Sequence, residues 1–244
     1  MSEPAASAVR PESVAAAVRR QARDELTRRI VGTARAQLAT VGAASLSLRA
    51  VARELGMVSS AVYRYVPSRD DLLTLLIVEA YDAVGAAAER SEAKVDRADL
   101  TGRFRAVCLG VRRWAIRHPH EYGLIYGSPV PGYAAPTDTI GPASRVGVLL
   151  VGLLVDAVEV GRYPRRGPEV GDAVRRATAP IRSFMPPQVP DELVVRGLMA
   201  WTYLFGAVSF DLFGHRHNVV ADAAGLREAF FEEEIVRIAA FVGL

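Results

Sequence analysis

The chain has 244 residues, of which half are hydrophobic and 23% charged, as in a globular protein that buries its own core. Its single cysteine, Cys108, excludes an intramolecular disulfide, and the apolar run before Arg19 and Arg20 is too short for a signal peptide. The longest apolar stretches, 146–155 and 197–210, fall short of the roughly 20 residues that span a bilayer. We therefore expect a cytoplasmic protein without membrane helices.

The net charge of +3 is unevenly distributed along the chain. Residues 1–69 hold eleven basic and five acidic side chains, a balance of +6, whereas residues 70–244 hold nineteen and twenty-two, a balance of −3. A basic front part favours a polyanionic partner such as nucleic acid. A solvated arginine-rich helix face would account for the charge equally well, so charge alone does not decide.

Apolar residues have helical spacing almost everywhere, and no stretch shows sustained alternation with period two, which predicts an all-α fold. Residues 1–12 have the composition of a disordered tail. The first helix is expected from about Ser13 or Arg19 to Thr40, and Gly42 ends it. Its apolar face is formed by Leu26, Ile30, Ala34 and Leu38.

Two short helices are expected next. Ser47 is placed to cap the first of them, and Gly56 is placed to end it in the left-handed conformation. Ser59 or Ser60 is placed to cap the second, which we expect to run to Val66 before Pro67. Ser68 and Asp71 then form the pattern of a capping box at the start of a long helix.

Two short helices joined at a glycine and braced by a longer helix make a helix-turn-helix, whose second helix enters the major groove of DNA. The stretch LSLRAVARELGMVSSAVYRYVPSRDDLLTLL, residues 46–76, resembles the DNA-binding signature of the TetR family of regulators. This resemblance implies a DNA-binding domain over residues 13–69 and a helical ligand-binding and dimerisation domain over residues 70–244.

The same resemblance implies contacts to double-stranded DNA for nine residues. It assigns a phosphate contact to Ser47, a guanine contact to Arg49 and a further base contact to Arg64. It places Ser59, Ser60 and Ala61 over the bases, and it assigns phosphate contacts to Tyr63, Tyr65 and Arg69. Structural roles stay open: Tyr63 in the core, Arg69 as a first-turn residue, and Arg53 as a solvated or Glu-paired side chain.

Six further helices are expected after a polar break at residues 91–99. They are 100–117, 119–126, 144–160, 168–184, 191–213 and 221–242. In this part of the chain Trp114, His118, Pro119, Tyr122 and Gly127 resemble the WHG-type C-terminal domain of some TetR-like regulators, as does the stretch AWTYLFGAVSFDLFGH.

Aromatic side chains in this part of the chain are candidates for lining a ligand pocket, although ordinary helix-bundle core is the commoner fate of such residues. The candidates are Phe104, Cys108, Trp114, Tyr122, Tyr126, Tyr133, Trp201 and Phe205. Two H-x-H pairs, His118 with His120 and His215 with His217, suggest a metal site. However, residues two apart on a helix point to nearly opposite sides, and no acidic or cysteine cluster completes the set. We expect neither a metal nor another cofactor.

The last two helices carry more apolar surface than one small bundle needs, which suits a subunit interface, and the resemblance implies that they pair in a homodimer. Two recognition helices would then lie ~34–36 Å apart on a near-palindromic operator. We expect a transcriptional regulator, usually a repressor in such families, released from DNA by an unidentified small molecule. An enzyme with a DNA-binding tether is one alternative, although G-x-S-x-G, H-E-x-x-H and phosphate-loop motifs are absent. A ligand-independent DNA-binding protein is the other.

Overall fold

A computed structural model of the chain describes residues 14–163, 168–221, 223 and 225–244. The predicted tail over residues 1–12 lies outside these residues, as does Ser13. All regular structure in the described part is helical, which confirms the all-α prediction. The chain divides into two compact units, Met1–Leu76 and Ile77–Leu244, whereas the sequence placed the boundary after Arg69.

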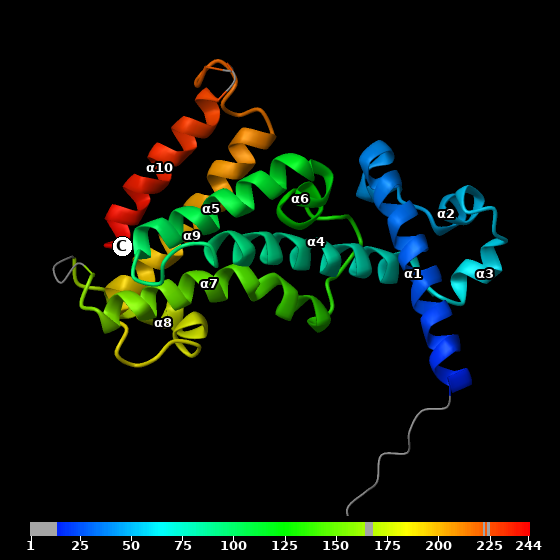
Figure 1. Ribbon diagram of the computed structural model, residues 1–244, viewed down its shortest axis with the longest axis horizontal. Coiled ribbons are helices and arrows are strands. Elements are labelled where there is room, and N and C mark those ends of the chain that lie inside the picture. The colour runs from blue at the N-terminus through cyan, green and yellow to red at the C-terminus, as the bar shows by residue number, and fades with distance from the viewer. Residues whose placement is uncertain (1–13, 164–167, 222, 224) are drawn as a thin grey trace, which may run out of the picture. The chain divides into compact units, whose positions relative to one another are not determined.

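The first unit contains α1 (Val14–Val41), a short 3-10 turn η1 (Ala43–Ser45), α2 (Leu48–Glu54) and α3 (Ser59–Tyr63), followed by the first turns of α4 (Arg69–Glu92). Figure 1 shows α2 and α3 following α1 in blue and cyan. Leu72, Leu73 and Leu76 of α4 are buried, which explains why the unit extends beyond the predicted boundary. The rest of its core is formed by Ile30, Val31, Ala34, Leu38, Leu46, Leu48, Val51, Ala52, Val62 and Val66.

Glycines end the first two helices, as the sequence predicts. Gly42 follows α1 with φ +72°, and Gly56 follows α2 with φ +66°, a region that side chains with a Cβ rarely adopt. At Gly56 the backbone N–H of Met57 donates to the Ala52 carbonyl at 2.9 Å, and the N–H of Gly56 donates to the Arg53 carbonyl at 3.1 Å. This pair of bonds is a Schellman motif, and it redirects the chain into α3.

The predicted serine caps of α2 and α3 are wrong in detail. Ser47 is the N-cap of α2, but its side chain makes no capping hydrogen bond. The N-cap of α3 is Val58, and α3 ends at Tyr63 instead of Val66, because Arg64 and Tyr65 continue as a turn with bonds to the Ala61 and Val62 carbonyls. The Ser68 pattern is confirmed, since Ser68 Oγ accepts from the Asp71 N–H at 3.0 Å and donates to the Asp71 carboxylate at 2.7 Å.

The second unit contains the rest of α4, then α5 (Leu100–Arg117), α6 (Pro119–Tyr126), η2 (Thr137–Thr139), α7 (Ile140–Glu159), α8 (Asp172–Arg182), α9 (Asp191–Leu212) and α10 (Leu226–Val242). The central helix is α5, which packs against α6, α7, α9 and α10 (Figure 1). The bounds of α5 and α6 match the prediction. Helix α7 begins earlier than predicted because Pro142 fits within its first turn, and α10 begins later, after Gly225 at φ +82°.

Helices α7 and α9 are longer than the apolar stretches predicted from the sequence. By length and composition alone each could cross a membrane, a property they share with core helices of soluble proteins. Both contribute to the core of the second unit, through Leu150, Leu153 and Leu154 of α7 and through Leu204 and Val208 of α9.

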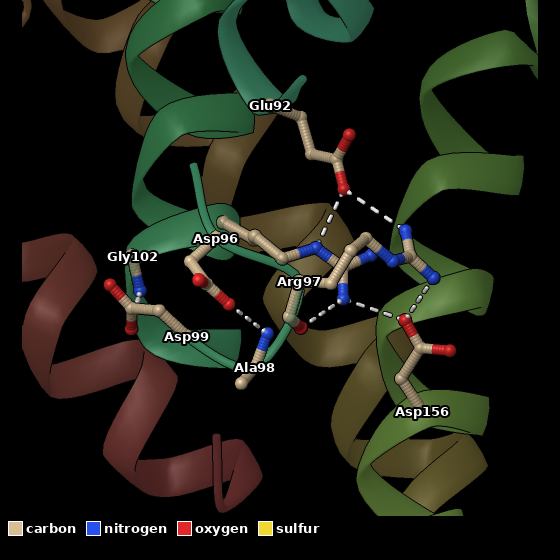
Figure 2. A network of polar contacts seen from close by, with 8 residues as sticks. Glu92, Asp96, Arg97, Ala98, Asp99, Gly102 and Asp156 are labelled. Carbon is tan, nitrogen blue, oxygen red and sulfur yellow. Dashed lines mark hydrogen bonds and ion pairs between the residues drawn. The ribbon is translucent and has the colours of Figure 1, made fainter. Parts of the chain in front are cut away.

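An ionic network ties α4, α5 and α7 together at one end of the second unit. The buried Arg103 of α5 donates to Glu92 at 2.6 Å and to Asp156 at 2.6 Å. Its guanidinium also donates to the carbonyl of Arg97 at 3.1 Å. Figure 2 shows Arg97 beside Glu92 and Asp156, while the Asp99 carboxylate accepts from the Gly102 N–H and caps α5. Three helices therefore share one balanced set of charges.

Candidate DNA-binding and ligand-binding sites

The outer face of α3 is polar, and its inner face is apolar. Val62 is fully buried, whereas Ser60, Tyr63 and Arg64 are exposed. Tyr63 is 39% exposed, so it is not a core tyrosine. Arg49 on α2 is also exposed, and the remaining candidates are half-buried: Ser47, Ser59, Ala61, Tyr65 and Arg69. All nine candidate DNA contacts thus lie on or near the surface of the first unit.

Arg69 has a structural role that the sequence did not predict. Its guanidinium donates to the Ala43 carbonyl at 2.8 Å, to the Ala44 carbonyl at 3.1 Å and to the Leu46 carbonyl at 3.2 Å. It thereby satisfies carbonyl groups of the turn between α1 and α2. The side chain remains one-third exposed, so the same guanidinium is also open to solvent.

Arg23 of α1 was missed by the sequence reasoning, which treated this part of the helix only as a carrier of charge. Its guanidinium donates to the Arg64 carbonyl at 3.4 Å and lies 5.4 Å from the centre of the Tyr65 ring. These contacts join α1 to the end of α3. No sequence motif marks Arg23. It lies seven residues before Ile30 and so on the same face of the helix, and this position could have indicated that it contacts the rest of the unit.

One cavity in the second unit is lined by apolar side chains and is small. It measures about 10 Å³, room for about one water molecule. Of the eight predicted pocket residues only Phe104 lines it, and the rest of its wall is Leu150, Leu154, Gly197, Ala200, Val242 and Leu244. The other seven predicted pocket residues lie outside this cavity.

Four of the predicted pocket residues, Tyr122, Tyr126, Trp201 and Phe205, belong instead to a continuous cluster of aromatic rings. We call this the aromatic cluster and define it as these four residues together with Tyr81 and Phe213. The ring of Tyr126 stacks on Phe205 at 4.2 Å and lies 5.1 Å from Tyr122. The cluster draws its residues from α4, α6, α9 and the turn after α9. Sequence reasoning missed Tyr81 and Phe213.

Three tyrosine hydroxyls belong to this aromatic cluster. The Tyr122 hydroxyl donates to the Phe205 carbonyl at 3.0 Å and is 2.9 Å from the Ser209 hydroxyl, and Tyr81 donates to the Ile125 carbonyl at 3.3 Å. Burial raises the pKa of Tyr122 to about 12 and raises the pKa of Tyr126 as well. All three phenols are therefore neutral at physiological pH.

The other predicted pocket residues lie elsewhere. Cys108 is fully buried in the core, and burial raises the pKa of its thiol. Trp114 is buried and stacks on His118 at 5.4 Å, while Tyr133 is half-buried in the loop after α6. Across the described ranges, no group of three or more His, Cys, Asp and Glu side chains could hold a metal ion.

Large apolar side chains are exposed on α9 and α10. On α9 and the turn after it they are Met199, Trp201, Phe210 and Phe213, and on α10 they are Leu226, Phe230, Val236 and Phe241. Four of these eight are phenylalanines, between 37% and 53% exposed. Such a concentration of apolar surface on neighbouring helices is typical of an interface.

Both units of the chain match known protein families. Residues 30–76 match the family described as bacterial regulatory proteins, tetR family, and residues 104–238 match a family described as tetracyclin repressor-like, C-terminal domain. The HTH-type transcriptional regulators Rv1816 of Mycobacterium tuberculosis and Mb1846 of Mycobacterium bovis are each 41% identical over 201 residues, covering 80% of this chain and 84% of theirs.

Solved structures share the fold. The regulatory protein SCO4313 superposes with a TM-score of 0.73 and 29% identity, covering 91% of this chain and 98% of its own. RolR, crystallised in complex with resorcinol, superposes with a TM-score of 0.50 and 16% identity, covering 89% of each chain. At that identity the likeness to RolR concerns the fold alone.

Proposed function

Because the chain belongs to the TetR family of DNA-binding transcriptional regulators, we propose that it acts as a homodimeric repressor which a small molecule releases from its operator. The module predicted over residues 13–69 binds DNA, and residues 70–244 bind the effector and the second protomer. We infer that it works in the cytoplasm, where its DNA is, and that it catalyses no reaction.

The observation that carries this proposal is the polar outer face of α3. The helix is held by buried Val62 and the Schellman turn at Gly56, so its position does not depend on DNA. Exposed Ser60, Tyr63 and Arg64 are then free to meet a groove. A short helix with this distribution of side chains suits insertion into the major groove.

The DNA-binding part of the proposal is tested by selection from a random duplex library followed by gel-shift measurements with the purified protein. DNA flanking its own gene provides a second probe. We expect enrichment of a near-palindrome and a specific shift that weakens as salt rises. Failure to enrich any sequence at any salt concentration would contradict the proposed function.

The homodimer is supported by the exposed apolar side chains of α9 and α10. Burying exposed aromatic side chains such as Phe210 and Phe230 in an interface removes them from water, and this favours association of two protomers. A two-fold axis between the protomers would present two α3 helices to two half-sites ~34–36 Å apart.

The effector site is proposed at the aromatic cluster, whose contacting rings include those of Tyr81, Tyr122 and Tyr126 and therefore carry three hydroxyls. Apolar walls with a few polar groups are typical of ligand pockets. The structure of RolR was solved with resorcinol, an aromatic diol, which favours testing phenols first. Since the rings of Tyr126, Phe205 and Tyr122 already contact one another, binding between them requires the rings to separate, and the effector must prefer the conformation that releases DNA.

A thermal-shift screen of phenols tests this site. An effector raises the melting temperature of the wild-type protein, and Tyr126→Ala abolishes that rise. The small size of the cavity favours one second candidate function, a DNA-binding protein that responds to no ligand. An unchanged melting temperature and unchanged DNA affinity across a broad compound library would support that alternative.

A further inference from the structure

The N-terminal turns of α1 project beyond the part of the chain that matches the family. The helix begins at Val14, whereas the match to the DNA-binding domain begins at residue 30. Residues 18–25 of this segment are exposed throughout, yet they are helical and carry Arg19, Arg20 and Arg23. Packing within the chain contributes little to the stability of such exposed helical turns, which leaves their side chains available to a partner.

The three arginines lie on one face of α1. With about 100° of rotation per residue, Arg19, Arg20 and Arg23 fall within an arc of about 100°. The same arc contains Ile30 and Ala34, which are fully buried against the rest of the first unit. One face of α1 is therefore apolar where the helix packs in the core of the first unit, and the same face carries arginines in the N-terminal turns.

Contacts of Arg23 place this basic face beside the recognition helix. Its guanidinium donates to the carbonyl of Arg64, the residue that follows α3, and lies over the ring of Tyr65. Arg64 and Tyr65 are themselves candidate DNA contacts. The basic face therefore adjoins the end of α3 instead of turning away from it.

The opposite side of α1 differs in charge. Glu25 lies almost opposite the three arginines and pairs with Arg28 at 2.7 Å. Arg28, Arg29 and Arg35 are exposed on that side, more than about 100° from the centre of the basic face. The helix thus offers two groups of three arginines, of which only one adjoins α3.

We propose that Arg19, Arg20 and Arg23 extend the DNA interface by contacting backbone phosphates that flank the base pairs under α3. The inference rests on the proposed DNA-binding function. Guanidinium groups bind phosphate oxygens with charge-assisted hydrogen bonds and carry no sequence information there. The extension lengthens the footprint and raises affinity for all sequences alike.

The test compares the triple variant Arg19→Gln, Arg20→Gln, Arg23→Gln with the wild-type protein on duplexes selected by the wild type. The plot of log affinity against log salt should become shallower by roughly 0.9 for each phosphate that no longer pairs with an arginine, up to about 3 for each protomer. Extending the duplex by ten base pairs on each side should strengthen wild-type binding and leave the triple variant unchanged.

A charge-matched control is the triple variant Arg28→Gln, Arg29→Gln, Arg35→Gln on the other side of the same helix. It should keep the wild-type salt slope and the gain from longer DNA. The double variant Arg19→Gln, Arg20→Gln leaves the bonds from Arg23 to the end of α3 in place and should still show about two-thirds of the change in slope. Lysines at all three positions should restore most of the slope, since they keep the charge.

The outcomes separate the inference from the proposed function. Equal slopes and equal gains from longer DNA for the two triple variants would overturn the phosphate contacts while leaving DNA binding intact. A wild-type protein that selects no sequence would instead contradict the proposed function itself. Circular dichroism and melting temperature establish that each variant remains folded.

Discussion

At the scale of single residues, exposed side chains on α2 and α3 divide into those suited to bases and those suited to phosphates. Arg49 is long, exposed and able to form two hydrogen bonds with a guanine edge, whereas the Tyr63 hydroxyl is a single donor suited to a phosphate oxygen. The two residues should consequently contribute to different properties of the complex.

We expect Tyr63→Phe to weaken binding to all DNA sequences by a similar factor, because a phosphate contact is blind to sequence. Arg49→Ala should instead relax the preference at one base pair by about 1–3 kcal/mol. Affinities for a panel of duplexes with single base-pair changes measure both effects. A uniform loss for both variants would refute this division of roles.

Tyr122 provides a second prediction at this scale. Its hydroxyl is bonded to the Phe205 carbonyl and the Ser209 hydroxyl inside the second unit. Tyr122→Phe should lower the free energy of unfolding by about 1 kcal/mol, because two buried polar partners lose a hydrogen bond. Urea denaturation measures the change, and Tyr63→Phe, which removes an exposed hydroxyl, serves as the control with unchanged stability.

Between elements, α4 and α7 are joined by Arg145. Its guanidinium donates to Glu89 at 2.9 and 2.5 Å and to the Asp82 carboxylate at 2.8 Å, and it fills the space that a side chain at Gly85 would occupy. Hydrogen bonding from Arg145 lowers the pKa of Glu89 below its usual 4.5. The charged form of Glu89 is therefore favoured in the folded state.

This shift predicts how stability depends on pH. A carboxylate whose pKa is lowered by folding stabilises the fold above its unfolded pKa, near 4.5, and loses that contribution as pH falls through its folded pKa. Glu89→Gln should cost less than about 1 kcal/mol at pH 7, since the pair is partly exposed to solvent. The difference from the wild type should disappear in acid, whereas Glu159→Gln at the exposed end of α7 should show no such trend.

The helix ends at Gly42 and Gly56 were predictable from sequence, whereas the end of α3 before Pro67 and the start of α10 after Gly225 were not. Gly42 and Gly56 each demand a left-handed backbone that few other residues adopt, so α1 and α2 end where expected. The serine caps were not predictable, because whether Ser59 or Val58 starts α3 depends on how the turn from Met57 packs. Periodicity placed Tyr122 and Tyr126 on one short helix, but only folding brings Tyr81 and Phe213 to them.

At the scale of the whole molecule, the apolar surface of α9 and α10 is the feature that a single protomer leaves unexplained. Phe210 is 53% exposed, although phenylalanine is among the residues that are most often buried. Burial against a second copy of the chain would remove this surface from water.

We expect Phe210→Glu to convert the dimer into monomers, because a charge buried in the interface lacks a partner. Analytical ultracentrifugation measures the association state, and DNA affinity should fall together with it by about 2 kcal/mol or more. Val148→Glu, at an exposed position on α7, is the matched control that should leave both unchanged. A dimeric Phe210→Glu protein with full DNA affinity would place the interface elsewhere.

The arginine at the centre of the ionic network has a consequence for how this sequence can change over time. Buried Arg103 pairs with both Glu92 and Asp156, which also pair with the exposed Arg97, and Arg103, Glu92 and Asp156 come from three different helices. Losing Arg103 leaves two carboxylates with only the exposed Arg97 as a partner, and losing either carboxylate leaves two arginines against one acid, each at a cost of up to about 3–5 kcal/mol. Three apolar side chains of similar total volume in place of Arg103, Glu92 and Asp156 would be tolerated, but this replacement needs three substitutions. Substitutions at these three positions should therefore occur together.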